Sequence, residues 1–340
     1  VLNPAAVRGP DGGLYLFPRL VGKGNYSRIG IAKVIFDEKG EPVGVNRLGV
    51  ALEPTADYEI RPEGGGCEDP RITFFEPLAE YIMTYTAFSS NGPRIAMATS
   101  KDLLHWERIG LADFANYKQI TFNDVYNKDA CIFPRSMLSP QGETSMVMLH
   151  RPLFPGTIPE DIMCDPVDRR IRDHHECIWI SYSDLLLKGG EAEHLQEFEA
   201  NSPLALPEAD WEKIKIGAGT PPVLTKLGWL LIYHGVHQME TSGDGPHRLV
   251  YSAGLMILDE HHPDKILYRS PVPILKPELL EEWIGTVPGV VFPTGIDRRD
   301  DIGKPNRFDI YYGMADNCIG VAQLDIPDEL PPSRPVLNEQ

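Results

Sequence analysis

The sequence predicts an all-β protein, a five-bladed β-propeller that forms a single domain over residues 1–340. The 31 glycines and 31 prolines are spread along the whole chain, which is typical of many short strands separated by turns. Long amphipathic helices are hard to find. A unit of two apolar strands behind a polar or proline-containing entry recurs at a spacing of roughly 60 residues, and such a spacing is typical of propeller blades.

Five copies of this unit follow one another along the chain. Their entries are Asn3-Pro4-Ala5, Glu68-Asp69-Pro70-Arg71, Asn127-Lys128-Asp129-Ala130, Gly219-Thr220-Pro221-Pro222 and Val291-Phe292-Pro293-Thr294-Gly295. The first strands are expected at 14–19, 81–85, 146–152, 229–235 and 308–313, and the second at 27–32, 94–100, 177–183, 251–255 and 319–322. In a propeller the innermost strand of each blade starts at one mouth of the central channel, so the five entries are expected to converge there.

Other segments are expected at the periphery. Helical pieces are predicted at 188–200, 207–211 and 276–283, and an insertion at about 155–176 interrupts the third unit. That insertion could cover an acceptor site or form an oligomer contact.

The charge and cysteine content restrict the class of protein. A formal charge of −17 argues against nucleic acid or an anionic membrane surface as the main partner. Five cysteines without paired short spacing indicate a reducing compartment. No apolar run approaches the length of a membrane span, and the first residues lack the pattern of a signal peptide. We therefore expect a cytoplasmic protein, and a homo-oligomer is compatible with this composition.

The stretch from Gly64 to Ile72 combines three glycines with two adjacent carboxylates, Glu68 and Asp69, and then a proline. The proline is expected to hold Asp69 in an extended conformation. Side chains two apart on an extended chain share a face, so the cation of Arg71 is expected beside the carboxylate of Asp69. The alternative is that this carboxylate only ties down a turn.

Taken together, the entries and the segments that follow them hold carboxylates and basic side chains. The carboxylates are Glu68, Asp69, Asp129 and Asp316, and the basic residues are Arg28, Arg71, Lys128, Arg151, Lys215 and His234. Carboxylates bind sugar hydroxyls and basic groups bind phosphate, so the set predicts a sugar site with an anion subsite. Each residue alone could equally be a structural charge.

Metal and nucleotide cofactors are not expected. His234 and His237 lie at the end of a predicted strand, and the adjacent pairs at 174–175 and 261–262 have no third ligand nearby in the sequence. No glycine-rich nucleotide fingerprint follows a strand. Trp106 and Trp229 lie in strand patterns and are expected in the core.

An ordered set of motifs resembles glycoside hydrolase family 130 over nearly the whole chain. The motifs are Gly66-Cys67-Glu68-Asp69-Pro70-Arg71-Ile72, Lys128-Asp129-Ala130, His150-Arg151-Pro152, Lys215-Ile216-Gly217-Ala218-Gly219-Thr220-Pro221-Pro222, Tyr233-His234-Gly235 and Tyr311-Tyr312-Gly313-Met314-Ala315-Asp316. The resemblance implies a five-bladed propeller and an inverting enzyme acting on β-mannosides, with most members phosphorylases and a minority hydrolases.

The resemblance also implies roles for individual residues. Asp69 matches the catalytic acid, which protonates the glycosidic oxygen through the mannose 3-hydroxyl. The positions that hold phosphate in the phosphorylases match Lys128, Arg151, Lys215 and His234. Those that contact mannose match Ser27, Arg28, Glu68, Arg71, Asp129 and Asp316. The implied reaction uses inorganic phosphate as co-substrate and releases α-mannose 1-phosphate.

Two alternatives stay open. The first is a β-mannosidase of the same fold, which needs a second carboxylate to activate water. Glu176 could be that base if its side chain reached the site formed by the converging entries. The second is a propeller that binds carbohydrate without turnover. The mannosidic linkage and the reducing-end sugar are not fixed by the sequence.

Overall fold

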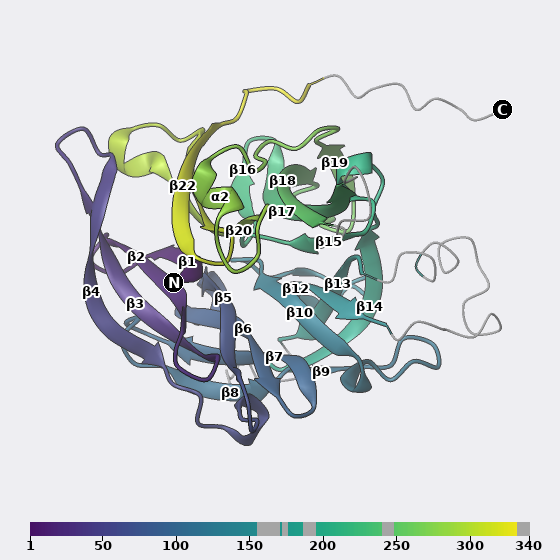
Figure 1. Ribbon diagram of the computed structural model, residues 1–340. Helices are drawn as coiled ribbons and strands as arrows, with labels where there is room; N and C mark the ends of the chain where they lie inside the picture. The colour runs from purple at the N-terminus through teal and green to yellow at the C-terminus, as the bar shows by residue number, and fades with distance from the viewer. Residues whose placement is uncertain (155–170, 172–175, 186–194, 240–247, 332–340) are drawn as a thin grey trace.

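The computed structural model describes residues 1–154, 171, 176–185, 195–239 and 248–331, which are mostly strands (Figure 1). They form four sheets of eight, six, five and three strands. The all-β prediction is confirmed. In this part of the chain, the helices are all too short or too polar to cross a membrane.

The first sheet contains two antiparallel meanders. They are β1 (Leu2–Arg8), β2 (Leu14–Val21), β3 (Tyr26–Phe36) and β4 (Pro42–Leu52), then β5 (Gly65–Phe75), β6 (Glu80–Ser89), β7 (Gly92–Ser100) and β8 (Glu107–Leu111). A short parallel pairing of β3 with β5 joins them, with Ser27 opposite Gly66. A Cβ at Gly66, where φ is +107°, would lie 2.1 Å from the main-chain oxygen of Ser27, so this junction requires glycine.

The other three sheets are each one antiparallel meander with short additions. The second comprises β10 (Tyr126–Ile132), β12 (Thr144–Leu153), β13 (Ile178–Asp184) and β14 (Glu197–Ala205), with β9 (Asp113–Phe114) and β11 (Met137–Leu138) at its edges. The third comprises β15 (Lys215–Ala218), β17 (Gly228–Met239), β18 (Arg248–Leu258) and β19 (Ile266–Arg269), with β16 (Val223–Thr225) beside β17. The last comprises β20 (Val291–Arg298), β21 (Arg307–Met314) and β22 (Cys318–Asp325).

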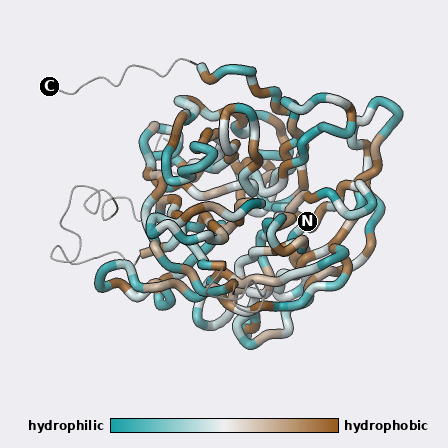
Figure 2. The backbone as a smooth tube through the Cα atoms, turned by 180° about the vertical axis from the view of Figure 1, so that it is seen from behind, coloured by the Kyte–Doolittle hydropathy of each residue, from teal (hydrophilic) through white to brown (hydrophobic). Residues whose placement is uncertain are grey.

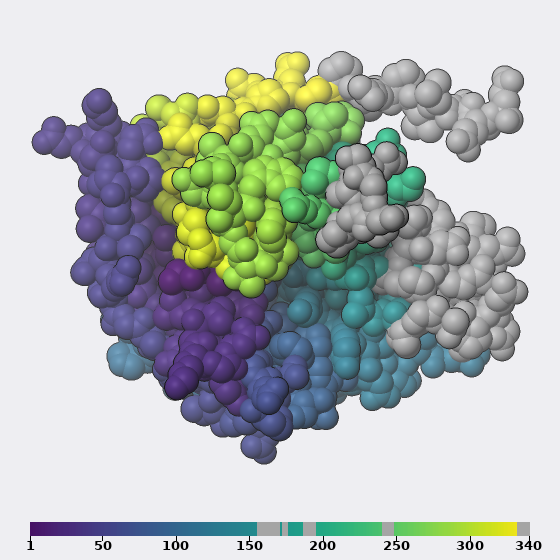
Figure 3. All heavy atoms as spheres, in the orientation of Figure 1, coloured from purple at the N-terminus to yellow at the C-terminus, as the bar shows by residue number. Residues whose placement is uncertain are grey.

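The first strands of successive meanders meet in the middle of the molecule. Strand β1 contacts both β5 and β20, β5 contacts β10, and β10 contacts β15 (Figure 1). The purple N-terminal and yellow C-terminal parts of the chain therefore adjoin in the space-filling view (Figure 3). The entries of the repeated units, which lie on or next to these strands, are therefore brought near one another, as expected from the sequence.

Clusters of buried apolar side chains fill the space between neighbouring meanders. Hydrophobic stretches of the chain are interspersed with hydrophilic ones throughout the backbone (Figure 2). Trp229 is 1% exposed, and its ring meets that of Phe133 edge-on at 5.3 Å, which joins the second sheet to the third. Trp106 packs edge-on against Phe17 with its centroid 5.7 Å away. Both tryptophans therefore contribute to core packing as predicted, although Trp106 is only partly buried and precedes strand β8.

The predicted helices are largely wrong. Residues 197–200 of the predicted 188–200 helix belong to strand β14, and residues 188–194 lie outside the described part of the chain. The 207–211 piece is reduced to a 3₁₀ turn at Asp210–Glu212, and 276–283 contains only the four-residue α2 (Leu280–Trp283). Most of the 155–176 insertion also lies outside the described residues. Acidic composition alone gives no helix without an apolar stripe to bury.

The sequence pattern did not predict the fourth strand of the meanders. Strands β4, β8 and β19 lie at the outer edges, β14 is followed only by the two-residue β9, and much of β4 is exposed. An outer strand packs on few neighbours, so it lacks the apolar run by which the inner strands are recognised.

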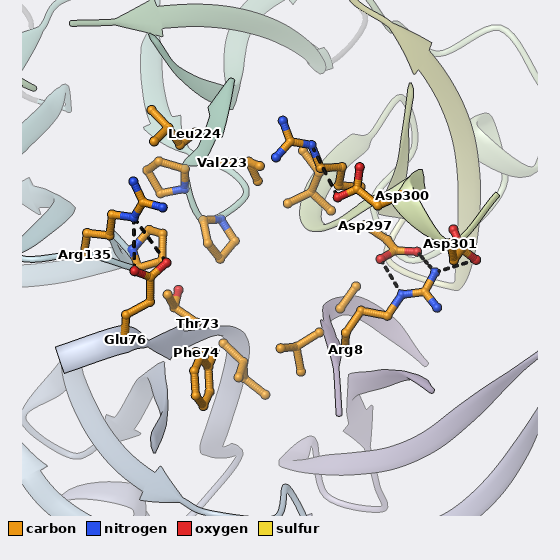
Figure 4. A pocket seen from close by; sticks show the side chains of 18 of the residues that line it. Arg8, Thr73, Phe74, Glu76, Arg135, Val223, Leu224, Asp297, Asp300 and Asp301 are labelled. Atoms are coloured by element: carbon orange, nitrogen blue, oxygen red, sulfur yellow. Dashed lines mark hydrogen bonds and ion pairs between the residues drawn. The ribbon is translucent and has the colours of Figure 1, made fainter. Parts of the chain in front are cut away.

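Ion pairs join the first meander to the last near the ends of β1 and β20 (Figure 4). Arg8 on β1 donates to both oxygens of Asp297 on β20, at 2.8 and 2.5 Å. Arg299, which is fully buried, donates to Asp309 on β21 at 2.6 Å and to the main-chain oxygen of Gly40 at 2.5 Å. Arg8 and Asp297 also line a cavity of about 550 Å³ there. These contacts hold the first and last meanders together.

Candidate active site

Three of the inner strands carry the same irregularity near their starts. In β1, β5 and β10 the pairing register shifts just where Asn3, Asp69 and Asp129 stand, and these residues have φ values of 45°, 47° and 55°. Asparagine and aspartate tolerate this left-handed conformation better than other residues with side chains. A bulge re-aims a side chain out of the regular alternation. The repeat thus places three similar polar side chains where the strands converge.

The conformation predicted for Asp69 is therefore wrong. Pro70 does restrict the chain, but the bulge places Asp69 in the left-handed region instead of an extended one. As a result, Arg71 does not reach the carboxylate of Asp69. Its Nη1 donates to the main-chain oxygen of Asp69 at 2.9 Å.

The carboxylate of Asp69 has two other partners. Asn3 Nδ2 donates to Oδ1 at 2.8 Å, and Arg19 Nη1 donates to the same oxygen at 3.4 Å. Oδ2 has no hydrogen-bond partner among the described residues, and the side chain is 14% exposed. One oxygen of Asp69 is thus held by the protein, whereas the other has no partner among the described residues.

Arg19 links Asp69 to its acidic neighbour Glu68. Its Nη2 donates to Glu68 Oε1 at 2.7 Å, and its Nε donates to the buried hydroxyl of Ser27 at 2.9 Å. Burial raises the pKa of Glu68, and the charge of Asp69 adds to this while Arg19 opposes it. Burial and the charge of Asp69 likewise raise the pKa of Asp316. The carboxylates around Asp69 therefore hold protons more readily than free ones.

Arg71 lies beneath this group. It is 2% exposed, donates from Nε to the main-chain oxygen of Gly219 at 3.0 Å, and lies 3.5 Å from Asp129 Oδ1. Its guanidinium also sits 5.6 Å from the centroid of the Phe292 ring. Arg71 therefore ties the second meander to the loop after β15, and its position is fixed on several sides.

Asp129 is the buried centre of the basic residues. Its Oδ2 accepts a hydrogen bond from Arg151 Nε at 2.6 Å and lies 3.6 Å from His234 Nε2. Burial alone would raise the pKa of Asp129, but the charges of Arg151, His234 and Arg71 outweigh it and hold that pKa well below its usual range. A carboxylate so enclosed is suited to positioning Arg71 and Arg151.

A cavity of about 160 Å³ opens beside Arg151. Its walls include three of the predicted phosphate ligands, Lys128, Arg151 and Lys215, and also Tyr126 and Glu176. Glu176 forms ion pairs with Arg151 and, at 3.6 Å, with Lys215. Its backbone is fixed, since it bridges Leu153 and accepts a hydrogen bond from the amide of Ile216. The cavity therefore presents three cations and one carboxylate.

His234, the fourth predicted phosphate ligand, is not among the residues that line this cavity. Its side chain is fully buried, its ring centroid lies 4.5 Å from that of Phe292 with the two planes tilted by 43°, and neither ring nitrogen has a hydrogen-bond partner in the described structure. Burial lowers the pKa of His234 to about 3, although Asp129 opposes the shift. As a phosphate ligand His234 stays a prediction, and a neutral imidazole there would bring no charge.

This burial has a measurable consequence for stability. The folded pKa of His234 lies below the ordinary value of 6.5, and so does that of the buried His150, also about 3. The unfolded chain therefore takes up these protons first as pH falls. We expect the free energy of unfolding to drop by about 1.4 kcal/mol per histidine per pH unit between pH 6.5 and 3. Urea unfolding at pH 7.0 and 5.0 would measure it, and the decrease should be about halved in His150→Gln; an unchanged slope would contradict the assignment.

The remaining predicted residues divide into two groups. Ser27 and Glu68 lie with Asp69 through Arg19, as described. Arg28 instead pairs with Glu53 at 3.0 Å and is 39% exposed, so no contact connects it to the acidic group. Arg28 as a mannose ligand stays a prediction.

Sequence reasoning missed Asn3 and Arg19. Asn3-Pro4 repeats the Asp69-Pro70 pair at the same position of the unit, and this parallel could have identified Asn3. Nothing in the pattern around Arg19 singles it out, because it reaches Asp69 only through the fold. Within the described residues no three His, Cys, Asp or Glu side chains are grouped to hold a metal ion, and the pair at 174–175 lies outside them.

Comparison with known proteins gives consistent likenesses. A family model described as beta-1,4-mannooligosaccharide phosphorylase matches residues 1–330. A 1,2-beta-oligomannan phosphorylase of Thermoanaerobacter sp. (strain X514) is 32% identical over 335 residues, which are 96% of this chain and 90% of that protein. A beta-1,4-mannooligosaccharide phosphorylase of Ruminococcus albus is 32% identical over 261 residues, 76% of this chain and 63% of the relative.

Solved structures share the fold. Beta-1,2-mannobiose phosphorylase from Listeria innocua, in complex with beta-1,2-mannobiose, superposes with a TM-score of 0.66 at 20% identity, covering 95% of this chain and 89% of that one. A glycosyl hydrolase from Bacteroides ovatus gives a TM-score of 0.66 at 24% identity, covering 95% and 83%. At these identities the likeness concerns the fold alone.

Proposed function

Since the family model spans nearly its whole length, this chain belongs to glycoside hydrolase family 130, and we propose that it is an inverting β-mannoside phosphorylase. The observation that carries the proposal is the cavity lined by Lys128, Arg151 and Lys215, which suits a phosphate ion. Arg151 is connected to Asp69 through Asp129 and Arg71. A cationic subsite and a carboxylic acid are the two groups that phosphorolysis needs.

In the proposed reaction, mannose lies between Asp69 and the cationic cavity. A phosphate oxygen attacks the anomeric carbon, the glycosidic C–O bond breaks on the opposite face, and the bonding electrons go to the leaving oxygen. Asp69 supplies the proton for that oxygen, relayed by the mannose 3-hydroxyl as the family resemblance implies. The products are α-mannose 1-phosphate and the shortened saccharide. Phosphate is already an anion, so no general base is required.

The proposed architecture is one domain built as a five-bladed propeller, each antiparallel meander being one blade. Its support is the contact of β1 with both β5 and β20, which brings the last meander beside the first. The proposed substrate is a manno-oligosaccharide, since the curated relatives described above are named for oligomannan and mannooligosaccharides. Cytoplasmic location is part of the proposal, supported by four free cysteines among the described residues.

A product assay tests the activity. The chain is incubated with β-1,2- and β-1,4-linked manno-oligosaccharides, with and without inorganic phosphate. Mannose 1-phosphate that forms only when phosphate is present supports phosphorolysis. Free mannose released at the same rate without phosphate would overturn it.

One observation favours a second candidate, a β-mannosidase. Glu176 contacts Arg151 and Lys215 inside the cavity, and a carboxylate there could activate water instead of leaving room for phosphate. Free mannose as the product of the wild-type chain would establish this candidate.

The Glu176→Gln variant separates the two candidates. In a phosphorylase the change removes a negative charge that competes with phosphate for Arg151 and Lys215. We then expect KM for phosphate to fall about tenfold with kcat largely retained. Two charges a few ångströms apart interact with an energy of the order of 1 kcal/mol or more even when partly screened, and about 1.4 kcal/mol corresponds to a factor of ten. Steady-state kinetics at varied phosphate would measure it, with Glu38→Gln on the exposed surface as control. A loss of turnover by a factor of about 100 or more would instead identify Glu176 as a base.

A further inference from the structure

The amide of Asn3 is wedged between the carboxylate of Asp69 and strand β21. Asn3 is 4% exposed, and its Nδ2 donates to Asp69 Oδ1 at 2.8 Å. Its own Oδ1 is buried and has no hydrogen-bond partner in the described structure. A buried amide oxygen without a partner is costly, so the fold keeps Asn3 there at the expense of stability.

Strand β21 leaves room for this amide only because residue 313 is glycine. A Cβ at Gly313 would lie 1.9 Å from Asn3 Oδ1 and 3.2 Å from its main-chain nitrogen. Gly313 is buried and has no positive φ, so its backbone conformation does not require glycine. What requires it is the close approach of Asn3.

We propose that Asn3 is a positioning residue that fixes the carboxyl group of Asp69, and that Gly313 is the space that makes this possible. The inference rests on the proposed role of Asp69 as the catalytic acid. It assigns to Asn3 an effect on the acid itself and not on sugar or phosphate affinity.

The chemistry of the two groups supports this assignment. An amide N–H can donate to a carboxyl oxygen whether the acid is charged or neutral, so Asn3 can hold Oδ1 throughout the reaction cycle. The acidic proton is then carried on Oδ2, which has no protein partner in the described structure. Arg19 reaches only the oxygen that Asn3 holds, at 3.4 Å. Proton delivery is thereby directed to one oxygen atom, which is what general acid catalysis needs.

The first test replaces the donor by an acceptor of the same shape. In Asn3→Asp a second carboxylate faces Asp69, and like charges favour retention of the proton. The alkaline limb of the kcat–pH profile should move up by about one pH unit or more, while KM for phosphate stays within about twofold of wild type. A raised KM for the mannoside with an unmoved limb would overturn the proposal, because Asn3 would then only bind sugar.

The second test alters the space and not the amide. Gly313→Ala should displace Asn3 and lower kcat by a factor of about 10 to 100 without changing phosphate KM. Gly320→Ala is the matched control, since a Cβ there would meet the Tyr312 ring at 2.6 Å but not Asn3. Thermal unfolding of both variants would separate instability from mispositioning. Equal kcat losses in the two variants at equal Tm would overturn the role of Gly313.

A third measurement does not depend on turnover. Carboxyl ¹³C NMR titration, with Asp69→Asn used to identify the Asp69 signal, should show that signal titrating at higher pH in Asn3→Asp than in wild type. An unmoved titration would overturn the inference even in an active enzyme. If the chain had no activity, the proposed function would be refuted, but the change in the Asp69 titration would still show whether Asn3 acts on the Asp69 carboxyl group.

Discussion

Replacing Asp69 by asparagine should reduce turnover by a factor of about 1,000 or more while leaving the mannoside bound. A general acid contributes roughly 10² to 10⁴ to the rate, and an amide keeps the shape of the carboxyl group without its acidic proton. Asn3 and Arg19 would still hold the side chain, because an amide oxygen also accepts hydrogen bonds. Initial rates of product formation and calorimetric binding of the mannoside would measure the two effects separately.

The matched control is Asp300→Asn, which removes a carboxyl group that is 62% exposed near the end of β20. It should retain wild-type turnover. If wild type and Asp69→Asn bind the mannoside equally and neither releases product, the chain is a carbohydrate-binding propeller and not an enzyme. If Asp69→Asn keeps normal turnover, the acid lies elsewhere.

Replacing Arg151 by methionine should raise KM for phosphate by a factor of about 100 or more and also weaken the fold. Two effects combine because Arg151 faces the cavity and pairs with the buried Asp129 at 2.6 Å. Loss of one partner of a buried ion pair costs about 3–5 kcal/mol, and here Asp129 would lose its nearest cation while Arg71 remains at 3.5 Å. Phosphate-dependent kinetics and urea unfolding would measure the two effects.

Lys128→Met provides the comparison. Lys128 lines the same cavity and lies 5.8 Å from the Phe88 ring, but it is not an ion-pair partner of Asp129. It should weaken phosphate binding with little change in the free energy of unfolding. If KM for phosphate were unchanged in both variants, the cavity would not be the phosphate site.

The internal repeat made most of the fold predictable. Recognising one strand pair after Asp69-Pro70 was enough to find its counterparts after Asn3, Lys128 and Val291, because the same packing problem recurs in each unit. The outer strands β4 and β14 could not be predicted. Their sequences mix polar and apolar residues without a clear alternation, and such patterns resemble those of loops or helices.

The sequence could predict which residues of the candidate site lie near one another, but not the contacts that each of them makes. Convergence of the entries explains why Arg151 and Lys215, 64 positions apart, line one cavity. Local geometry was not predictable in the same way. The rule for residues before proline gave an extended Asp69, whereas the bulge reversed its φ and left its carboxylate to Arg19 instead of Arg71.

The contact of β1 with β20 has a consequence for biosynthesis. Strand β1 is synthesised long before β20, the strand it packs against, which begins only at residue 291. The nascent N-terminal strand must therefore wait with its inner edge uncovered, exposed to misassembly or to chaperones, until translation is nearly complete. A transcript truncated before codon 291 would yield an open arc that cannot close on itself.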